Sequence, residues 1–311
     1  LLAGEPQALP LPELPNRDRW FLPEVSAALT ALKRAIDEAP APDSIRRFCY
    51  LALSSLIVAR TSVANARDLV HSRHHFRVHA TPPNVLARFR QRCAAMGRQM
   101  AAFSAQADTA VHAGVVRADA RALPLRDEGT QLIFTSPPYC NAVDYTRTHV
   151  FAVAWLADIL GTSPSDYVKM GRRYIGTDRA RKSHCLDDLF AGYESRVAAQ
   201  AVAEVSRVDR VRAGVLARYF ADMSRVLAEC GRLLAPGGHA VFVVCPSRIR
   251  GVTVPTHRAL TEIAAGLPIS LRLVEEAERT LDDSRRIMPY LHEGFGQRMR
   301  TEYVVVLRRT G

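Results

Sequence analysis

The segment with the clearest chemical character is Thr135–Tyr139, which reads Thr-Ser-Pro-Pro-Tyr. It follows Gln131–Phe134, a short apolar run that predicts a buried strand. Prolines lack an N–H donor and have a fixed φ, so two in succession must end the strand in a stiff, extended turn. The turn begins at Ser136, holds the proline carbonyls as acceptors in fixed directions, and offers the flat ring of Tyr139.

Such a turn suits a planar ligand that carries an amine, such as a nucleobase. Open α/β folds bind ligands at the carboxyl ends of their strands, where we expect Ser136, Pro137 and Tyr139 to lie. An exocyclic amine would donate to Ser136 Oγ and to a proline carbonyl while its ring stacks on Tyr139. The alternative is a Pro-Pro turn with a packed tyrosine and no ligand, and the preceding strand favours the binding site.

Taken with this preceding strand, Thr135–Tyr139 resembles the catalytic motif of amino-group DNA methyltransferases, in the Ser-Pro-Pro-Tyr form associated with cytosine-N4 enzymes. The resemblance covers residues 113–311 and includes Gly237-Gly238 and the strand after them. It implies an α/β fold with a class I, Rossmann-like methyltransferase sheet flanked by helices. It also implies S-adenosyl-L-methionine as cofactor, DNA as substrate, and a catalytic set of Ser136, Pro137, Pro138 and Tyr139.

The resemblance leaves the target base open. Relatives that modify adenine N6 more often carry Asp or Asn where this chain has Ser136, so the motif favours cytosine N4 over adenine N6. RNA is a weaker alternative, since related RNA methyltransferases usually have Asp or Asn there too. A non-enzyme alternative is a DNA-binding or specificity subunit with a relic methyltransferase fold. The resemblance also suggests a restriction-modification setting with a partner nuclease.

A candidate cofactor ligand precedes the catalytic strand. Gly114–Arg117 predicts a short strand that leads to Asp119, and class I methyltransferases place a carboxylate at this point near the adenine of the cofactor. The resemblance therefore implies that Asp119 and Ala120, together with Thr135, bind the cofactor. Asp119 as a simple turn cap is an equally good interpretation.

The chain departs from the family in one respect. The family's glycine-rich loop, of the form Phe-x-Gly-x-Gly, is not found before the catalytic strand, and neither is its first strand. We expect that loop upstream of Leu1, while a permuted order and a degenerate subunit are the alternatives. We therefore predict that these 311 residues alone are inactive and bind the cofactor weakly.

The pattern of the chain divides it into three parts. Residues 1–19 are Pro-rich and predict an arm or linker, residues 20–112 predict a helical subdomain, and residues 113–311 predict the catalytic core. The subdomain has helical periodicity from Pro23, from Asp43 to about Ala59, and from Asn84 to Gln106, and we expect the apolar stripe of the last helix to be core.

The catalytic core contains a basic insertion at about 161–212, which serves either target recognition or as a lid. We expect its later half, 190–212, to be a solvated helical face. A helix at 215–233 should end at Pro236-Gly237-Gly238, and strands at 239–244, 269–274 and 302–307 and a helix at 255–265 complete the prediction.

The charge of the chain favours a nucleic-acid partner. Its net charge is +11 and its pI about 9.8, with arginine dominating the basic residues. Arginine makes bidentate contacts with phosphate and guanine. The candidate DNA-binding residues are Arg172, Arg173, Arg179, Arg285 and Arg286.

Cysteine and histidine usage argues against a metal site. The six cysteines are scattered with no Cys-x-x-Cys pair, which fits reduced thiols in the cytoplasm. The histidine-rich segment 60–81 has no Cys, Asp or Glu at ligand spacing, so we expect a solvated or phosphate-facing loop there instead. No apolar run is as long as a membrane span, and no signal peptide is visible.

Overall fold

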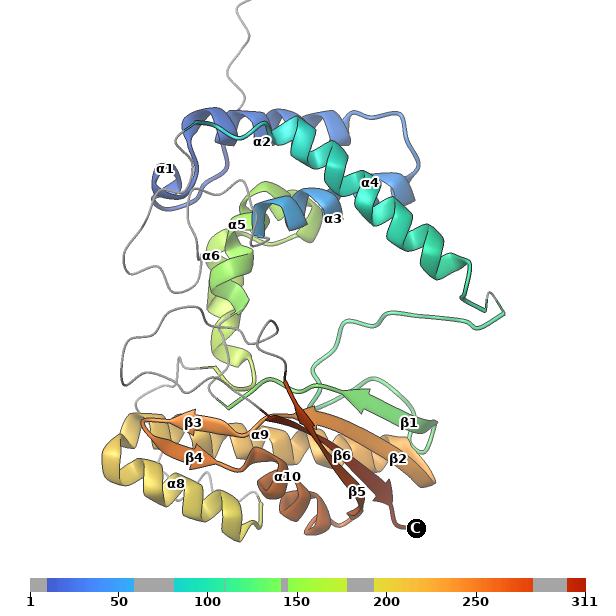
Figure 1. The fold of residues 1–311 in the computed structure, drawn as a ribbon, viewed down its shortest axis with the longest axis vertical. Coiled ribbons are helices and arrows are strands. Elements are labelled where there is room, and N and C mark those ends of the chain that lie inside the picture. Colours follow the sequence, from blue (N-terminus) through green and yellow to red (C-terminus); the bar gives the residue numbers. More distant parts are fainter. Residues whose placement is uncertain (1–9, 59–80, 109, 141–144, 178–192, 282–300) are drawn as a thin grey trace, which may run out of the picture. The chain divides into compact units, whose positions relative to one another are not determined.

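The computed structural model describes residues 10–58, 81–108, 110–140, 145–177, 193–281 and 301–311. The chain forms two units, whose helices and strands are drawn in Figure 1. Each unit has its own hydrophobic core. The first unit comprises Leu1–Gly114 and Asp144–Gly171, and the second comprises Val115–Val143 and Arg172–Gly311.

The first unit is helical throughout its described elements. Its helices are α1 (Arg17–Trp20), α2 (Pro23–Asp37), α3 (Asp43–Val58), α4 (Val85–Ser104), α5 (Tyr145–Leu160) and α6 (Pro164–Met170). Pro23 occupies the first turn of α2, where its missing N–H costs nothing. The side chain of Asn84 caps α4 by accepting from the backbone N–H of Ala87. These starts confirm the helices predicted at Pro23, Asp43 and Asn84.

Aromatic rings and one buried ammonium hold the first unit together. Phe21 packs edge to face against Phe151 and Trp155, with ring centroids 6.1 Å and 5.0 Å away. Lys33 on α2 is buried, and its Nζ lies 2.8 Å from Asp158 on α5. The bond to Asp158 therefore ties α2 to α5, which lies more than a hundred residues later in the chain.

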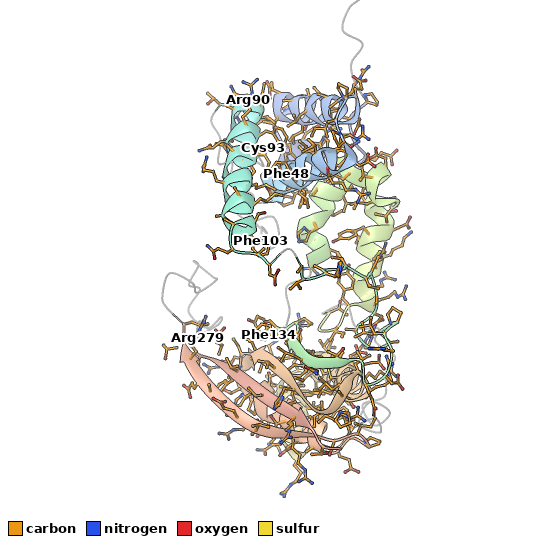
Figure 2. All side chains as sticks on the ribbon, turned by 90° about the vertical axis from the view of Figure 1, so that its right-hand side faces the viewer. Phe48, Arg90, Cys93, Phe103, Phe134 and Arg279 are labelled. Atoms are coloured by element: carbon orange, nitrogen blue, oxygen red, sulfur yellow. The ribbon has the colours of Figure 1, made fainter. Side chains whose placement is uncertain are left out.

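The second half of α4 is not core, contrary to the sequence prediction. Val85 is buried, but Met100 is 56% exposed and Phe103 is 73% exposed. Phe103 is labelled on α4 in Figure 2. The apolar stripe exists, yet α4 contacts α2 and α3 mainly through its first half. A periodic pattern says which side of a helix is apolar, not whether another element covers it.

The second unit is a mixed α/β structure around a central sheet (Figure 1). The sheet has the order β1-β2-β6-β5, with β1 parallel to β2 and β6 antiparallel to both β2 and β5. Its strands are β1 (Thr130–Thr135), β2 (Leu234–Val244), β5 (Leu271–Thr280) and β6 (Thr301–Arg309). Further elements are η1 (Gly171–Arg173), α8 (Arg196–Val208), α9 (Arg210–Leu233), β3 (Ser247–Ile249), β4 (Val252–Val254) and α10 (Thr256–Ala265).

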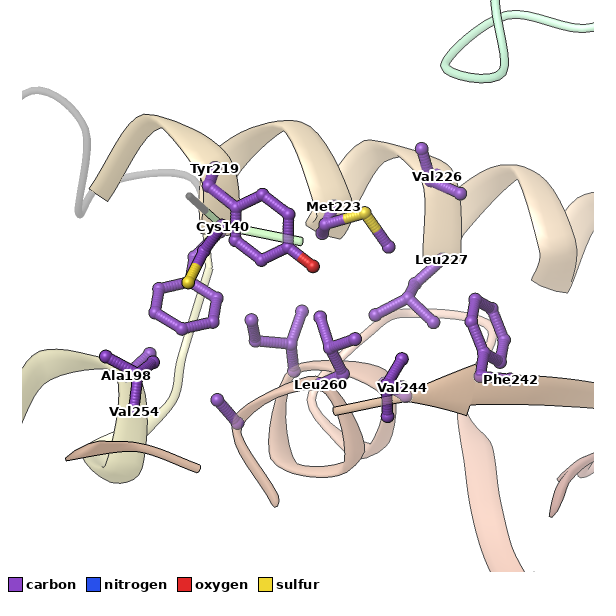
Figure 3. Close-up of a cluster of buried hydrophobic side chains, with 14 of the residues drawn as sticks. Cys140, Ala198, Tyr219, Met223, Val226, Leu227, Phe242, Val244, Val254 and Leu260 are labelled. Carbon is purple, nitrogen blue, oxygen red and sulfur yellow. The ribbon is translucent and has the colours of Figure 1, made fainter. Parts of the chain in front are cut away.

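Helices α8, α9 and α10 build the core on one face of this sheet. Figure 3 shows Tyr219, Met223 and Leu227 of α9 turned toward Phe242 and Val244 of β2. All five side chains are at most 2% exposed, so this layer is closely packed. Because β1 runs parallel to β2, both strands deliver their carboxyl ends to the same edge, with Thr135 opposite Phe242.

No described residue covers the other face of β1, so the prediction that this strand is buried is wrong. Leu132 is 59% exposed and Phe134, which is labelled in Figure 2, is 71% exposed. Among the described strands, β1 pairs only with β2, where Phe134 lies opposite Val241. A continuous apolar run predicts that both faces of a strand are buried, whereas here α9 and α10 pack against one face.

Three further predictions for this unit are corrected. Residues 114–117 form no strand, and Val115 is fully exposed. Helix α9 ends at Leu233, and the Pro-Gly-Gly segment 236–238 lies inside β2 instead of terminating the helix. Helix α8 is not a solvated face, because Ala198, Val202 and Val205 of this helix are buried in the core.

The remaining predicted elements are confirmed with shifted ends. The strand predicted at 269–274 is β5, and the strand predicted at 302–307 is β6. The helix predicted at 255–265 is α10. No described helix is long and apolar enough to span a membrane.

Candidate active site

The strand β1 ends at Thr135, and the next residue, Ser136, is exposed at the sheet edge. Ser136 Oγ donates a hydrogen bond to the backbone carbonyl of Val243, 3.2 Å away on β2. A hydroxyl has one proton and two acceptor lone pairs. With its proton directed at Val243, Ser136 presents the oxygen as an acceptor to any other group.

The two prolines and the cysteine that follows Tyr139 are packed within the second unit. Pro137 is buried and Pro138 is half-buried, and Cys140 just beyond them is fully buried within the hydrophobic core. Burial raises the pKa of the Cys140 thiol to about 11. This thiol is therefore neutral at physiological pH, so its part is packing and not nucleophilic chemistry.

Tyr139 is joined to the end of the neighbouring strand. Its hydroxyl accepts a weak hydrogen bond from Cys245 Sγ, 3.7 Å away and immediately after β2. Cys245 is buried, and burial raises the pKa of its thiol. Tyr139 is half-buried, so the contact anchors the phenol while part of the side chain faces solvent.

Asp119 lies in a tight turn that is closed by an isolated bridge to Ala122. Its Oδ1 accepts from the backbone N–H and the Nε of Arg121 at 3.0 Å, and its Oδ2 accepts from Arg121 Nη2 at 2.8 Å. These side-chain bonds lower the pKa of Asp119 to about 2. The carboxylate is therefore ionised and turn-capping, and at 43% exposure it keeps room for another donor.

Arg121 and Asp222 are functional candidates that the sequence analysis missed. Arg121 Nη1 donates to Asp222 Oδ1 on α9 at 2.8 Å, so a buried acid supports the turn that carries Asp119. The signal in the sequence was an acid among the apolar residues of the stripe that includes Tyr219 and Met223. An acid in such a place needs a partner, which spacing alone did not reveal.

The candidate DNA-binding arginines are only partly described. Arg172 and Arg173 are exposed, while their backbone carbonyls accept from Arg218 Nη2 and Arg121 Nη2, both at 3.1 Å. The positive charge of Arg173 also helps to lower the Asp119 pKa. Ala120 is exposed and Thr135 is half-buried in β1.

Several predicted positions lie outside the described residues. They are Arg179, Arg285, Arg286 and most of the histidine-rich segment 60–81. Within the described part of the chain, no three His, Cys, Asp or Glu side chains gather as metal ligands would.

Comparison with protein families found no family model that matches the chain. Among curated proteins, the chain is 22% identical to the type II methyltransferase M.MvaI of Kocuria varians, over 81% of this chain and 57% of that protein. It is 28% identical to the type II methyltransferase M.AvaI of Nostoc, over 42% of this chain and 29% of that protein. It is 26% identical to M.BsoBI of Geobacillus stearothermophilus, over 50% and 34%.

A solved structure also resembles the chain. It is a DNA modification methylase from Thermus thermophilus complexed with S-adenosyl-L-methionine, with a TM-score of 0.31 and 16% identity over 62% of this chain and 54% of that one. The chain spans between 29% and 57% of the length of the curated relatives given above. Over those stretches, this protein is similar to type II DNA methyltransferases.

Proposed function

We propose that this protein takes part in DNA methylation, as the part of a methyltransferase that holds the target amine. The proposed substrate is the exocyclic N4 amine of a cytosine that has left the DNA stack, and the proposed methyl donor is S-adenosyl-L-methionine. The proposed fold is the class I, Rossmann-like methyltransferase fold. One observation carries the proposal: the Ser136 proton is committed to the Val243 carbonyl, which turns Ser136 Oγ into a fixed acceptor.

An acceptor at this point is what an aromatic amine requires. The lone pair of a cytosine amine is delocalised into the ring, so the nitrogen is planar and weakly nucleophilic. Two acceptors, Ser136 Oγ and the Pro137 carbonyl, would draw its N–H bonds out of the ring plane and localise the lone pair. Neither acceptor is a strong base, so the proton leaves after the methyl group has bonded. The protein therefore contributes mainly alignment and exclusion of water.

The residues around the corner suit this chemistry in two further ways. Tyr139 supplies a ring for stacking on the target base, worth about 1–3 kcal/mol per base. The raised pKa of Cys245 keeps its thiol protonated beside that ring. A thiolate there would be a better nucleophile than the amine and would compete for an alkylating group.

The residues of the Asp119 turn fit a cofactor that contains adenine. The ionised carboxylate of Asp119 is exposed and accepts hydrogen bonds, as the amine of adenine requires. We propose that Asp119, Ala120 and Thr135 hold S-adenosyl-L-methionine. When bound, that cofactor supplies an activated methyl group on a positively charged sulfur.

The proposed DNA contacts follow from charge and exposure. A net charge of +11 favours phosphate, and Arg172 and Arg173 are exposed with their backbone held by α9 side chains and Arg121. A base inside a duplex cannot reach a loop at a sheet edge, so the target must be flipped out or single-stranded. Binding through phosphates predicts an affinity that falls steeply with salt.

The decisive experiment is mass spectrometry of nucleosides from DNA of a host that lacks its own methyltransferases and expresses this chain joined to the glycine-rich cofactor loop that we expect upstream of it. The expected product is N4-methylcytosine. N6-methyladenine would overturn the base assignment and keep the reaction class. DNA that is bound by the protein but never modified would support the non-catalytic subunit instead.

A further inference from the structure

Asp222 is a buried acid in the middle of helix α9. Its side chain is 9% exposed, and it follows Tyr219 and precedes Met223, both in the hydrophobic core. Oδ1 accepts from Arg121 Nη1 at 2.8 Å, whereas Oδ2 has no hydrogen-bond partner among the described residues, and Arg218 Nε lies 3.7 Å from it. A buried carboxylate with one unsatisfied oxygen is costly, so a purely structural role explains it poorly.

Arg121 connects this buried acid to the exposed one. Its guanidinium uses Nη1 for Asp222, and uses Nε and Nη2 as a fork on the two oxygens of Asp119. Nη2 also donates to the backbone carbonyl of Arg173 at 3.1 Å. The guanidinium is 17% exposed, so its position is set by these partners and not by solvent.

Exposure increases along this chain of contacts. It is 9% at Asp222, 17% at Arg121 and 43% at Asp119. Arginine binds a carboxylate in one plane through two parallel N–H bonds, so fixing the guanidinium fixes the plane of the Asp119 carboxylate. The lone pairs that remain on Asp119 then point in directions set by a residue more than a hundred positions later.

We propose that Asp222 is a positioning residue: through Arg121 it aims the Asp119 carboxylate at the amine of the cofactor's adenine ring. This inference rests on the proposed function, because it takes Asp119 as a ligand of S-adenosyl-L-methionine. It adds a residue of α9 and an arginine to the recognition of that ring, and it assigns the buried Asp222 carboxylate, through Oδ1, to orienting Arg121.

The helix itself offers a matched control. Glu229, two turns further along α9, also accepts from an arginine, Arg232, at 2.7 Å. It accepts from the backbone N–H of Leu123 at 2.8 Å, so it supports the same loop. Within the described part of the chain, Glu229 makes no bond to Arg121 or Asp119, so removing it tests loop support alone.

The test compares two ligands that differ at one position of the ring. S-adenosylhomocysteine carries the adenine amine, and S-inosylhomocysteine carries a carbonyl oxygen there, which a carboxylate repels. Ligand-observed NMR titration measures both dissociation constants, including weak ones, for the parent, Asp222→Ala, Asp222→Asn and Glu229→Ala. We expect the parent to prefer the adenosyl ligand by about tenfold, on the scale of one hydrogen bond to a charged group.

Asp222→Ala should weaken binding of the adenosyl ligand by about tenfold and leave the inosyl ligand nearly unchanged, so the preference disappears. Asp222→Asn, which keeps an acceptor for Arg121, should retain part of the preference, and Glu229→Ala should retain all of it. Equal losses for both ligands in Asp222→Ala, or an unchanged preference, would overturn the inference and leave the proposed function standing. A parent without any preference would remove Asp119 from the cofactor site and the inference with it, whereas nucleoside analysis decides the proposed function independently.

Discussion

Ser136 and Val243 lie 107 positions apart in the sequence, and a hydrogen bond of 3.2 Å joins the hydroxyl of the first to the carbonyl of the second. The bond crosses from the end of β1 to β2, and it exists because the two strands are parallel neighbours with Thr135 opposite Phe242. Because this bond uses the hydroxyl proton, Ser136 Oγ can only accept further hydrogen bonds. The proposed recognition of an amine depends on this relationship more than on any other.

Ser136→Ala should slow methyl transfer by about tenfold or more, because one acceptor for the amine is lost. DNA affinity should change little, since the contacts with phosphate are unaffected. Single-turnover methylation and DNA titration measure the two quantities, both with the chain joined to the glycine-rich loop that we expect upstream of it. Ser270→Ala is a suitable control, because this hydroxyl pairs with Thr310 Oγ1 at 2.7 Å, and Thr310 directly follows β6. Equal losses of rate and affinity would indicate that the corner is merely structural.

Tyr139→Ala and Tyr139→Phe should separate the ring from its hydroxyl. Alanine removes the stacking surface. The lost contact with the base should cost roughly 1–3 kcal/mol of binding free energy, and the rate of methyl transfer should fall accordingly. Phenylalanine keeps the ring and loses the hydroxyl, with its weak contact to Cys245, so its rate should stay near that of the parent. The same single-turnover assay measures both variants, and a phenylalanine variant as slow as the alanine variant would contradict a stacking role.

Asp119→Asn should change how the stability of the fold depends on pH. The folded-state pKa of Asp119 is about 2, below its ordinary 3.8, chiefly through its side-chain bonds to Arg121. A lowered pKa means that its stabilising effect is present above pH 3.8 and is lost as pH falls toward 2. The melting temperature of the parent should therefore fall more steeply across this window than that of the variant. Solvent screens this exposed side chain, so the difference will be modest, and parallel curves would refute the effect.

Phe242 and Phe134 offer a test of which face of the sheet is core. Phe242 on β2 is 2% exposed, so Phe242→Ala should cost about 3–5 kcal/mol of unfolding free energy. Phe134 on the neighbouring strand is 71% exposed, so Phe134→Ala should cost less than about 1 kcal/mol. Urea unfolding followed by circular dichroism measures both. A large loss for Phe134→Ala would mean that its side chain is covered in solution.

Local sequence patterns predicted where helices and strands occur better than they predicted what packs against them. Pro23 and Asn84 mark helix starts in the sequence and in the structure, because a missing N–H and a capping side chain act on the adjacent turn. The predicted helix end at Leu233 is confirmed, but the Pro-Gly-Gly segment does not terminate the helix. Gly238 instead sits inside β2, where a Cβ would lie 2.9 Å from the carbonyl oxygen of Ala235 and 3.0 Å from that of Gln131. Close approach of backbone, not a turn, requires glycine at that position.

The sequence by itself determined the proline corner after β1, the apolar stripe of α9 and the excess of positive charge. Only the tertiary structure decided that Leu132 and Phe134 of β1 are exposed among the described residues, that Ser136 donates to Val243, and that a buried acid on α9 holds Arg121. The reason is physical. Turn chemistry and periodicity act between near neighbours in the chain, whereas burial and hydrogen-bond partners depend on which distant segments pack together.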